Sequence, residues 1–131
     1  MKRAITIAAA LWVAATATLK ASPAVHTIPE AQAIKAIIGE AGGQGWKAMR
    51  AVASALRNRG TLQGVYGVHN RLASHAGAKL RAMALRAWRA SAGADVTNGC
   101  AYFGCPADRP YLLAYGLRPV MTVASITFYE P

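Results

Sequence analysis

Acidic side chains are scarce in this sequence: 5 Asp and Glu stand against 15 Lys and Arg over 131 residues, which gives a formal net charge of +10. A charge of this size influences the choice of partners more than the fold. It favours three anionic partners: nucleic acid, a membrane surface or a cell-wall polymer. The hydrophobic fraction of 54% excludes a disordered tail, and the length suits one domain with a modest core.

Cysteine and histidine are also rare, with 2 and 3 residues. Cys100 and Cys105 are too few to hold a zinc ion, and the histidines show no ligand spacing, so we expect no metal and no cofactor. In an oxidising compartment, Cys100 and Cys105 are expected to form a disulfide that closes a small loop; a free pair of thiols is the alternative.

Residues 4–19 contain no charged residue and follow a basic start at residues 1–3. This pattern, with small residues at 21–24, is typical of a secretory signal peptide. We therefore expect residues 1–24 to be a signal peptide, or an uncleaved N-terminal anchor that leaves transient membrane contact open. Residues 25–131 would form one exported domain in the periplasm or cell wall, with a monomer as the expected state. A cytosolic protein with a buried N-terminal helix is the alternative.

Helical periodicity dominates the next part of the chain. Apolar residues recur at helical spacing from about residue 30 to Gly42-Gly43, again from Trp46 to about Arg59, and a third time over residues 76–91. The glycines after the first two segments are typical of helix ends. Residues 60–75 are expected to be loop with one short turn.

The last third of the chain has a different composition. Asn98-Gly99 and Gly104 indicate turns, and residues 101–103 between them suit a short strand. Residues 120–129 are rich in Val, Ile, Thr and aromatics, which predicts one or two terminal strands. The fold class is therefore α+β: a single, mostly helical domain with a small β element in the C-terminal third.

Glu40 stands out among the five carboxylates. Glu30 suits a capping box with Thr27, Glu130 lies next to the C-terminus, and two aspartates fall in predicted loops. Glu40 instead continues the apolar face of the first helix and lies at its C-terminal end. Burial and the helix dipole both raise the pKa of a carboxyl in such a place.

An acid that stays protonated near neutral pH is what cleavage of a glycosidic bond requires. Glu40 is therefore the candidate catalytic residue. The alternative is structural: Glu40 could form an ion pair with Arg57 or Arg59 on the second helix.

A family resemblance adds to this interpretation. Residues 37–46, Ile-Ile-Gly-Glu-Ala followed by Gly-Gly-Gln-Gly-Trp, and a second helix closing in Asn58-Arg59 resemble the opening of the cell-wall hydrolase family that includes spore-cortex-lytic enzymes. Residues 98–103 resemble the family's Gly-Gly-Ala-x-x-Phe segment, and Phe128-Tyr129 its terminal Phe-Tyr. The match covers about residues 31–129.

This resemblance implies a lysozyme-like fold and cleavage of peptidoglycan between N-acetylmuramic acid and N-acetylglucosamine. It assigns the catalytic role to Glu40. It also implies that a few motif residues line or support the substrate cleft: Asn58, Tyr102, Phe103 and Tyr129. Each has a structural alternative, as a helix-end residue for Asn58 and as core for the aromatics.

The sequence departs from the family pattern in three places. The histidine that usually precedes the terminal Phe-Tyr is replaced by Ile126 or a neighbour, residues 60–95 differ and are rich in Arg, and the two cysteines are unusual. These departures bear on substrate details more than on Glu40.

A lytic transglycosylase needs one carboxyl, because the substrate's own C6 hydroxyl replaces water. A hydrolytic muramidase usually needs a second carboxylate, which Asp95 or Asp108 could supply. Glu30 could not, because ten residues of helix put it about 15 Å from Glu40. Three other classes remain open: a cationic cell-wall-binding protein without turnover, a membrane-active protein, and a nucleic-acid-binding protein, which the signal-like start argues against.

Overall fold

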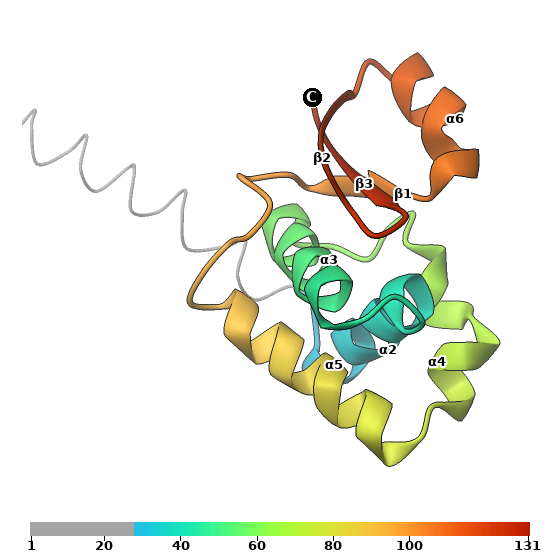
Figure 1. The fold of residues 1–131 in the computed structure, drawn as a ribbon, viewed down its shortest axis with the longest axis vertical. Helices are drawn as coiled ribbons and strands as arrows, with labels where there is room; N and C mark the ends of the chain where they lie inside the picture. Colours follow the sequence, from blue (N-terminus) through green and yellow to red (C-terminus); the bar gives the residue numbers. More distant parts are fainter. Residues whose placement is uncertain (1–27) are drawn as a thin grey trace, which may run out of the picture.

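The computed structural model describes residues 28–131, in which a helical part carries a smaller strand-bearing part (Figure 1). The helical part contains α2 (Glu30–Ala41), α3 (Trp46–Arg59), η2 (Tyr66–His69), α4 (Arg71–His75) and α5 (Ala78–Ser91). The strand-bearing part contains β1 (Tyr102–Gly104), η3 (Pro106–Asp108), α6 (Arg109–Ala114), β2 (Arg118–Val123) and β3 (Ile126–Glu130). Within the described range no helix is long and apolar enough to cross a membrane. The predicted signal peptide or anchor at residues 1–24 lies outside that range.

The core lies between α2, α3 and α5. Small side chains on α2 and α3 let the two helices approach closely, and larger apolar side chains fill the space around them. The fully buried members are Ala33, Ala36, Ile37 and Ile38 on α2, and Ala48, Met49, Val52, Ala53, Ala55 and Leu56 on α3. Arg57 fastens α3 to α5: its guanidinium lies 3.8 Å from the centre of the Trp88 ring and donates to Ser91 Oγ at 2.7 Å.

The three predicted helices are confirmed, with one error at the start of α2. Its N-cap is Pro29, in an extended conformation and with no side-chain hydrogen bond, rather than the predicted Thr27. Thr27 lies outside the described residues. Glu30 instead pairs with Arg89 of α5, with 3.2 Å between nitrogen and oxygen. Glu30 therefore has a structural role, though a different one from that predicted.

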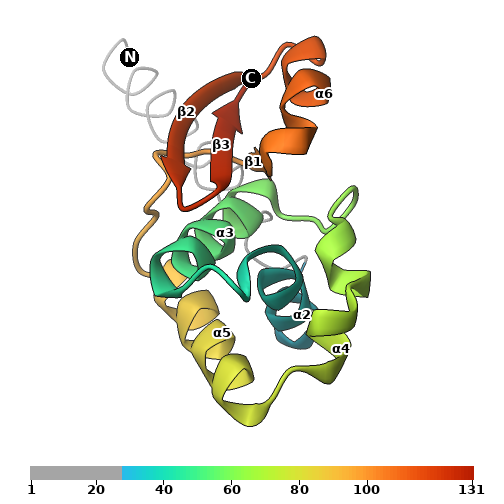
Figure 2. The ribbon, with the colours of Figure 1, turned by 45° about the vertical axis from the view of Figure 1, so that its right-hand side comes forward.

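The sheet is antiparallel with the order β1-β3-β2 (Figure 2). Its central strand, β3, contributes the buried side chains of Ile126, Phe128 and Tyr129. Phe103 of β1 lies opposite Phe128 of β3, with ring centroids 6.0 Å apart. Gln44, in the turn after α2, accepts hydrogen bonds at Oε1 from the backbone N–H (2.9 Å) and hydroxyl (2.6 Å) of Ser125, in the β2–β3 turn. The predicted fold class, mostly helical with a small β element in the C-terminal third, is confirmed.

The predicted disulfide is absent from the structure. Cys100 is a buried free thiol and Cys105 an exposed one. The extended strand β1 separates them, and an odd spacing along an extended chain directs two side chains to opposite sides. A disulfide requires the two Cα atoms within about 7 Å and their Cβ atoms facing each other.

The helix η2 lies directly on the C-terminal end of α2. A Cβ atom added to Gly39 would lie 1.8 Å from the carbonyl oxygen of Gly67, and one added to Gly67 would lie 2.7 Å from Oε1 of Glu40. At Gly39 backbone therefore meets backbone, and at Gly67 an added Cβ would displace the Glu40 carboxyl. Glycine is required at both places by close approach rather than by an unusual φ angle.

Gly39→Ala is expected to lower the free energy of unfolding by about 1–3 kcal/mol, because η2 must move away from α2. In an unobstructed helix, the same change would stabilise by about 1 kcal/mol. Gly43→Ala, in the turn after α2, is the control for a glycine replaced without a clash, since an added Cβ there meets nothing within 4 Å. Denaturant unfolding of the two variants measures the difference, and equal stabilities would contradict the contact.

Candidate active site

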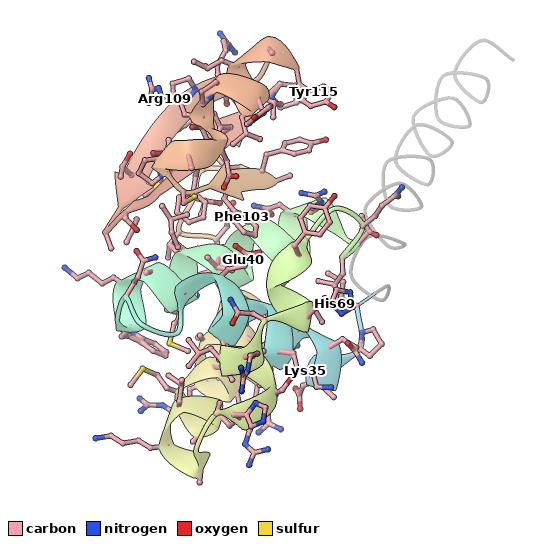
Figure 3. The ribbon with its side chains drawn as sticks, turned by 90° about the vertical axis from the view of Figure 1, so that its right-hand side faces the viewer. Lys35, Glu40, His69, Phe103, Arg109 and Tyr115 are labelled. Atoms are coloured by element: carbon pink, nitrogen blue, oxygen red, sulfur yellow. The ribbon has the colours of Figure 1, made fainter. Side chains whose placement is uncertain are left out.

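Glu40 is the penultimate residue of α2 and is half-buried. Its Oε1 accepts a hydrogen bond of 2.9 Å from the backbone N–H of Gly67. Because this donor is backbone on a helix packed against α2, it fixes the carboxyl without adding a charge. Figure 3 shows the Glu40 side chain at the boundary between the helical and strand-bearing parts, facing Phe103.

Glu40 opens into a cleft formed by three adjoining cavities, which we call the Glu40 cleft. The middle cavity, of about 420 Å³, lies between α2 and η2 on one side and β1, η3 and α6 on the other. It is lined by Glu40, Arg59, Gly64, Val65, Tyr66, Phe103, Asp108, Tyr111, Leu112 and Tyr115. A second cavity of about 510 Å³ shares Arg59, Gly64, Phe103, Leu112 and Tyr115, and adds Tyr102 and Leu117. A third of about 360 Å³ shares Glu40, Tyr66 and Asp108, and adds Gly39, Gly67, His69 and Asn70.

The pKa of Glu40 is raised above its ordinary value. Burial is the main cause, since it penalises the charged form, and the negative charge of Asp108 adds to it. The Gly67 hydrogen bond and the positive charge of Arg59 act in the opposite direction. The site therefore holds a proton more tightly than an exposed Glu does.

Glu40 forms no ion pair among the residues of the described range. The ion pairs there are Arg89–Glu30 and Arg118–Glu130. Arg57 is directed to Ser91 and Trp88, and Arg59 donates to the Gln63 carbonyl. The structural alternative for Glu40, a salt bridge with Arg57 or Arg59, is therefore wrong.

Of the two candidate second carboxylates, Asp108 lines the Glu40 cleft and Asp95 lines none of its three cavities. Asp108 is held by two features: its Oδ2 accepts from the Cys105 N–H at 2.9 Å, and Gly104 leaves room for it, since a Cβ there would lie 2.8 Å from Asp108 Cβ. Asp108 is thus the carboxylate that shares a cavity with Glu40.

Asp95 stabilises the loop before β1. It accepts hydrogen bonds from the N–H groups of Thr97 (2.8 Å) and Gly99 (2.6 Å). Burial pushes the pKa of Asp95 upward, but the hydrogen bonds together hold it below its ordinary value. A carboxylate kept ionised by loop donors and located away from Glu40 is a structural group.

Asn58 belongs to the same loop rather than to the cleft wall. Its Nδ2 donates to the carbonyl of Cys100 at 3.0 Å, to Asp95 Oδ2 at 3.1 Å and to Thr97 Oγ1 at 3.3 Å. These bonds join the end of α3 to the segment that leads into β1. Asn58 therefore holds in place the segment that leads into β1, whose residues line the cleft, and does not line the cleft itself.

The three aromatic residues named from the sequence have different positions. Phe103 lines the middle cavity next to Glu40, and Tyr102 lines the adjoining one, with the Arg59 guanidinium 5.2 Å from its ring centre. Tyr129 is fully buried and lines none of the three cavities. The structure thus places Glu40, Phe103 and Tyr102 along one cleft and leaves Tyr129 in the core.

Three exposed tyrosines line the cleft and were not found from the sequence. Tyr66 is 81% exposed, Tyr111 70% and Tyr115 85%, so their rings face solvent at the rim. Tyr66 belongs to η2, within the segment predicted to be loop with one short turn, and the other two belong to α6 and its end, which were not predicted. The signal available in the sequence was the aromatic residues themselves, because Tyr66 lies between turn-forming glycines and Tyr111 and Tyr115 flank a short Leu-Leu-Ala run.

Two solved structures resemble this one. The catalytic domain of the germination-specific lytic transglycosylase SleB from Bacillus anthracis superposes with a TM-score of 0.60 at 18% identity, covering 77% of this chain and 93% of that one. The catalytic domain of the Bacillus cereus SleB protein superposes with a TM-score of 0.56 at 20% identity, covering 80% and 97%. The chain has the fold of these catalytic domains. No family model and no curated protein sequence matches.

The shared fold with the SleB catalytic domains confirms, at the level of fold, the resemblance seen in the sequence. Among residues 28–131, no group of three or more His, Cys, Asp or Glu side chains is placed to hold a metal ion.

Glu40→Gln is expected to raise the stability of the protein near neutral pH. The folded state holds the Glu40 proton more tightly than the unfolded chain, so the wild-type free energy of unfolding falls as pH rises from the ordinary pKa of 4.5 through the higher folded value. The charged groups and the histidine that face Glu40, or line its cavities, are Asp108, Arg59 and His69, and the other titratable side chains there are tyrosines. The variant leaves all of them unchanged.

Thermal unfolding of both proteins across this interval measures the effect. The Tm difference, variant minus wild type, should be small below the ordinary pKa and grow as pH rises. A variant that is no more stable than wild type at neutral pH would contradict the raised pKa.

Proposed function

We propose that this protein cleaves peptidoglycan glycan strands between N-acetylmuramic acid and N-acetylglucosamine, as an exported lytic transglycosylase with Glu40 as its acid and base. The observation that carries the proposal is the position of Glu40: a carboxyl with a raised pKa, held by one backbone N–H, that opens into a cleft of three adjoining cavities. The fold shared with two SleB catalytic domains supports it.

The proposed reaction uses one carboxyl twice. Glu40 donates its proton to the glycosidic oxygen while the bond from that oxygen to C1 breaks, which leaves an oxocarbenium-like sugar. The resulting carboxylate then accepts the proton of the C6 hydroxyl on the same sugar, as that oxygen bonds to C1 and closes a 1,6-anhydro ring. Water is not consumed, and Glu40 returns to its protonated state.

Several features of the cleft suit a glycan strand. The exposed rings of Tyr66 and Tyr115 offer apolar faces against which sugar rings can pack, and Phe103 covers the cleft opposite Glu40. The net charge of +10 attracts an anionic wall polymer over long distances. Action on peptidoglycan places the protein in the periplasm or cell wall, in agreement with the signal-like residues 1–24.

Glu40→Gln is expected to lower the rate of strand cleavage by about 10²–10⁴-fold, because the amide cannot donate the proton. Mass spectrometry of the soluble fragments released from purified peptidoglycan by the full chain and by the variant measures this. Anhydro-muropeptides that disappear with Glu40→Gln are the expected result. Binding to peptidoglycan without fragments from either protein would instead identify a non-catalytic cationic wall-binding protein.

A hydrolytic muramidase is the second candidate, and the position of Asp108 favours it. Asp108 lines the same cavity as Glu40, as the second carboxylate of a two-carboxyl mechanism must. In a hydrolase it would activate water or stabilise the sugar cation, and the products would carry reducing ends. In a transglycosylase, the Asp108 charge has another effect, which is to raise the pKa of Glu40.

Asp108→Asn separates these two roles. For the transglycosylase, we expect anhydro products to persist and the loss of activity at high pH to begin at lower pH, because the variant removes a charge that raises the Glu40 pKa. Asp95→Asn, away from the cleft, is the control and should leave this pH limb in place. Reducing-end products from wild type that disappear with Asp108→Asn would establish the hydrolase instead.

A further inference from the structure

The charges along the Glu40 cleft are distributed unevenly. Glu40 and Asp108 both line the 360 Å³ cavity at one end, which contains no Lys or Arg. Arg59 lines the 510 Å³ cavity at the other end, which contains no carboxylate. All three side chains meet in the middle cavity. Because Glu40 holds its proton in the proposed reaction, a ligand that spans the cleft meets the negative charge of Asp108 at one end and the positive charge of Arg59 at the other.

Arg59 is built into this end of the cleft. Its guanidinium lies 5.2 Å from the centre of the Tyr102 ring and donates through Nη2 to the carbonyl of Gln63. The loop after α3 is shaped around it: Gly64 has a φ of +78°, and a Cβ there would lie 2.9 Å from Arg59 Nη2. The side chain is thus held in place before any ligand arrives, which reduces the entropy that binding costs.

Arg59 has no carboxylate partner within the described part of the chain. The two ion pairs there involve Arg89 and Arg118, and the hydrogen bond to Gln63 occupies one of the five guanidinium N–H groups. Arg57, two residues earlier, differs because its guanidinium already donates hydrogen bonds to Ser91 Oγ and to the carbonyl of Trp88. A fixed guanidinium with free donors in a cleft matches a carboxylate, which it can hold with two parallel hydrogen bonds.

We propose that Arg59, backed by Tyr102 and the Gly64 loop, forms a subsite that binds a carboxylate carried by a muramic acid residue of the glycan. The inference rests on the proposed function and names a recognition residue for it. Two sources share this chemistry: the lactyl carboxylate of a muramic acid without a peptide, and the terminal carboxylate of a peptide stem. The negative charge of Asp108 at the other end of the cleft repels the same group, so the subsite also sets the direction in which the strand lies.

Binding is measured by calorimetry with the full chain carrying Glu40→Gln, so that no ligand is cleaved. The ligands are short strands of alternating N-acetylglucosamine and N-acetylmuramic acid in two matched pairs. In the first pair the lactyl carboxyls are free or converted to methylamides. In the second pair the strands carry peptide stems whose terminal carboxyls are free or amidated.

We expect neutralisation in one pair to weaken binding about 10- to 100-fold, the range for a charged hydrogen-bonded contact, and the pair that responds identifies the source. Adding Arg59→Gln should weaken binding of the charged ligand by a similar factor and leave the neutral ligand unchanged. Arg81→Gln, an exposed arginine of α5 outside the cleft, is the control for net charge.

Equal affinities within both pairs would overturn the subsite, and this result does not depend on any Arg59 variant folding. Equal weakening of charged and neutral ligands by Arg59→Gln would overturn it as well, because the residue would then be structural. Failure of every glycan to bind would overturn the proposed function itself, and the subsite with it.

Discussion

The contact of the Gly39 and Gly67 backbones is the constraint on which the site depends. Because neither residue has a side chain, η2 can lie against the last turn of α2, and the Gly67 N–H reaches Oε1 of Glu40 at 2.9 Å. The same contact partly buries the carboxyl. A single packing feature therefore sets the orientation of Glu40, its hydrogen bond and the burial that raises its pKa.

The other wall of the cleft depends on a third glycine. Gly104 ends β1 and leaves room for η3 to fold back, which brings Asp108 and then α6 over Glu40. The sheet and the Asn58 hydrogen bonds hold this wall on α3. The helical part thus supplies the acid, and the strand-bearing part supplies the charge and the aromatic surface that act on it.

Much of this arrangement is predictable from local sequence. The apolar spacing of α2 and α3 gave both helices and placed Glu40 on a buried face, because periodicity reports burial directly. The residues opposite Glu40 were less accessible. Segment 106–115 combines two prolines and an Asp with a Leu-Leu-Ala run too short to show a helical period, so neither α6 nor the cleft position of Tyr115 was predicted. Asp108 was one of two candidate second carboxylates, and only the fold distinguishes it from Asp95. Whether Cys100 and Cys105 could form a disulfide depended on the extended path of β1. The interior position of Tyr129 depended on how the sheet packs on the helices.

The carboxyl pKa of Glu40 tests the account most directly. The chain has three glutamates, so the side-chain carboxyl carbons of a ¹³C-Glu-labelled protein give three titration curves, and Glu40→Gln identifies the relevant one. The account predicts a midpoint clearly above the ordinary 4.5, which moves down in Asp108→Asn. A Glu40 midpoint at or below 4.5 would contradict it, because the carboxyl would then have no proton to donate.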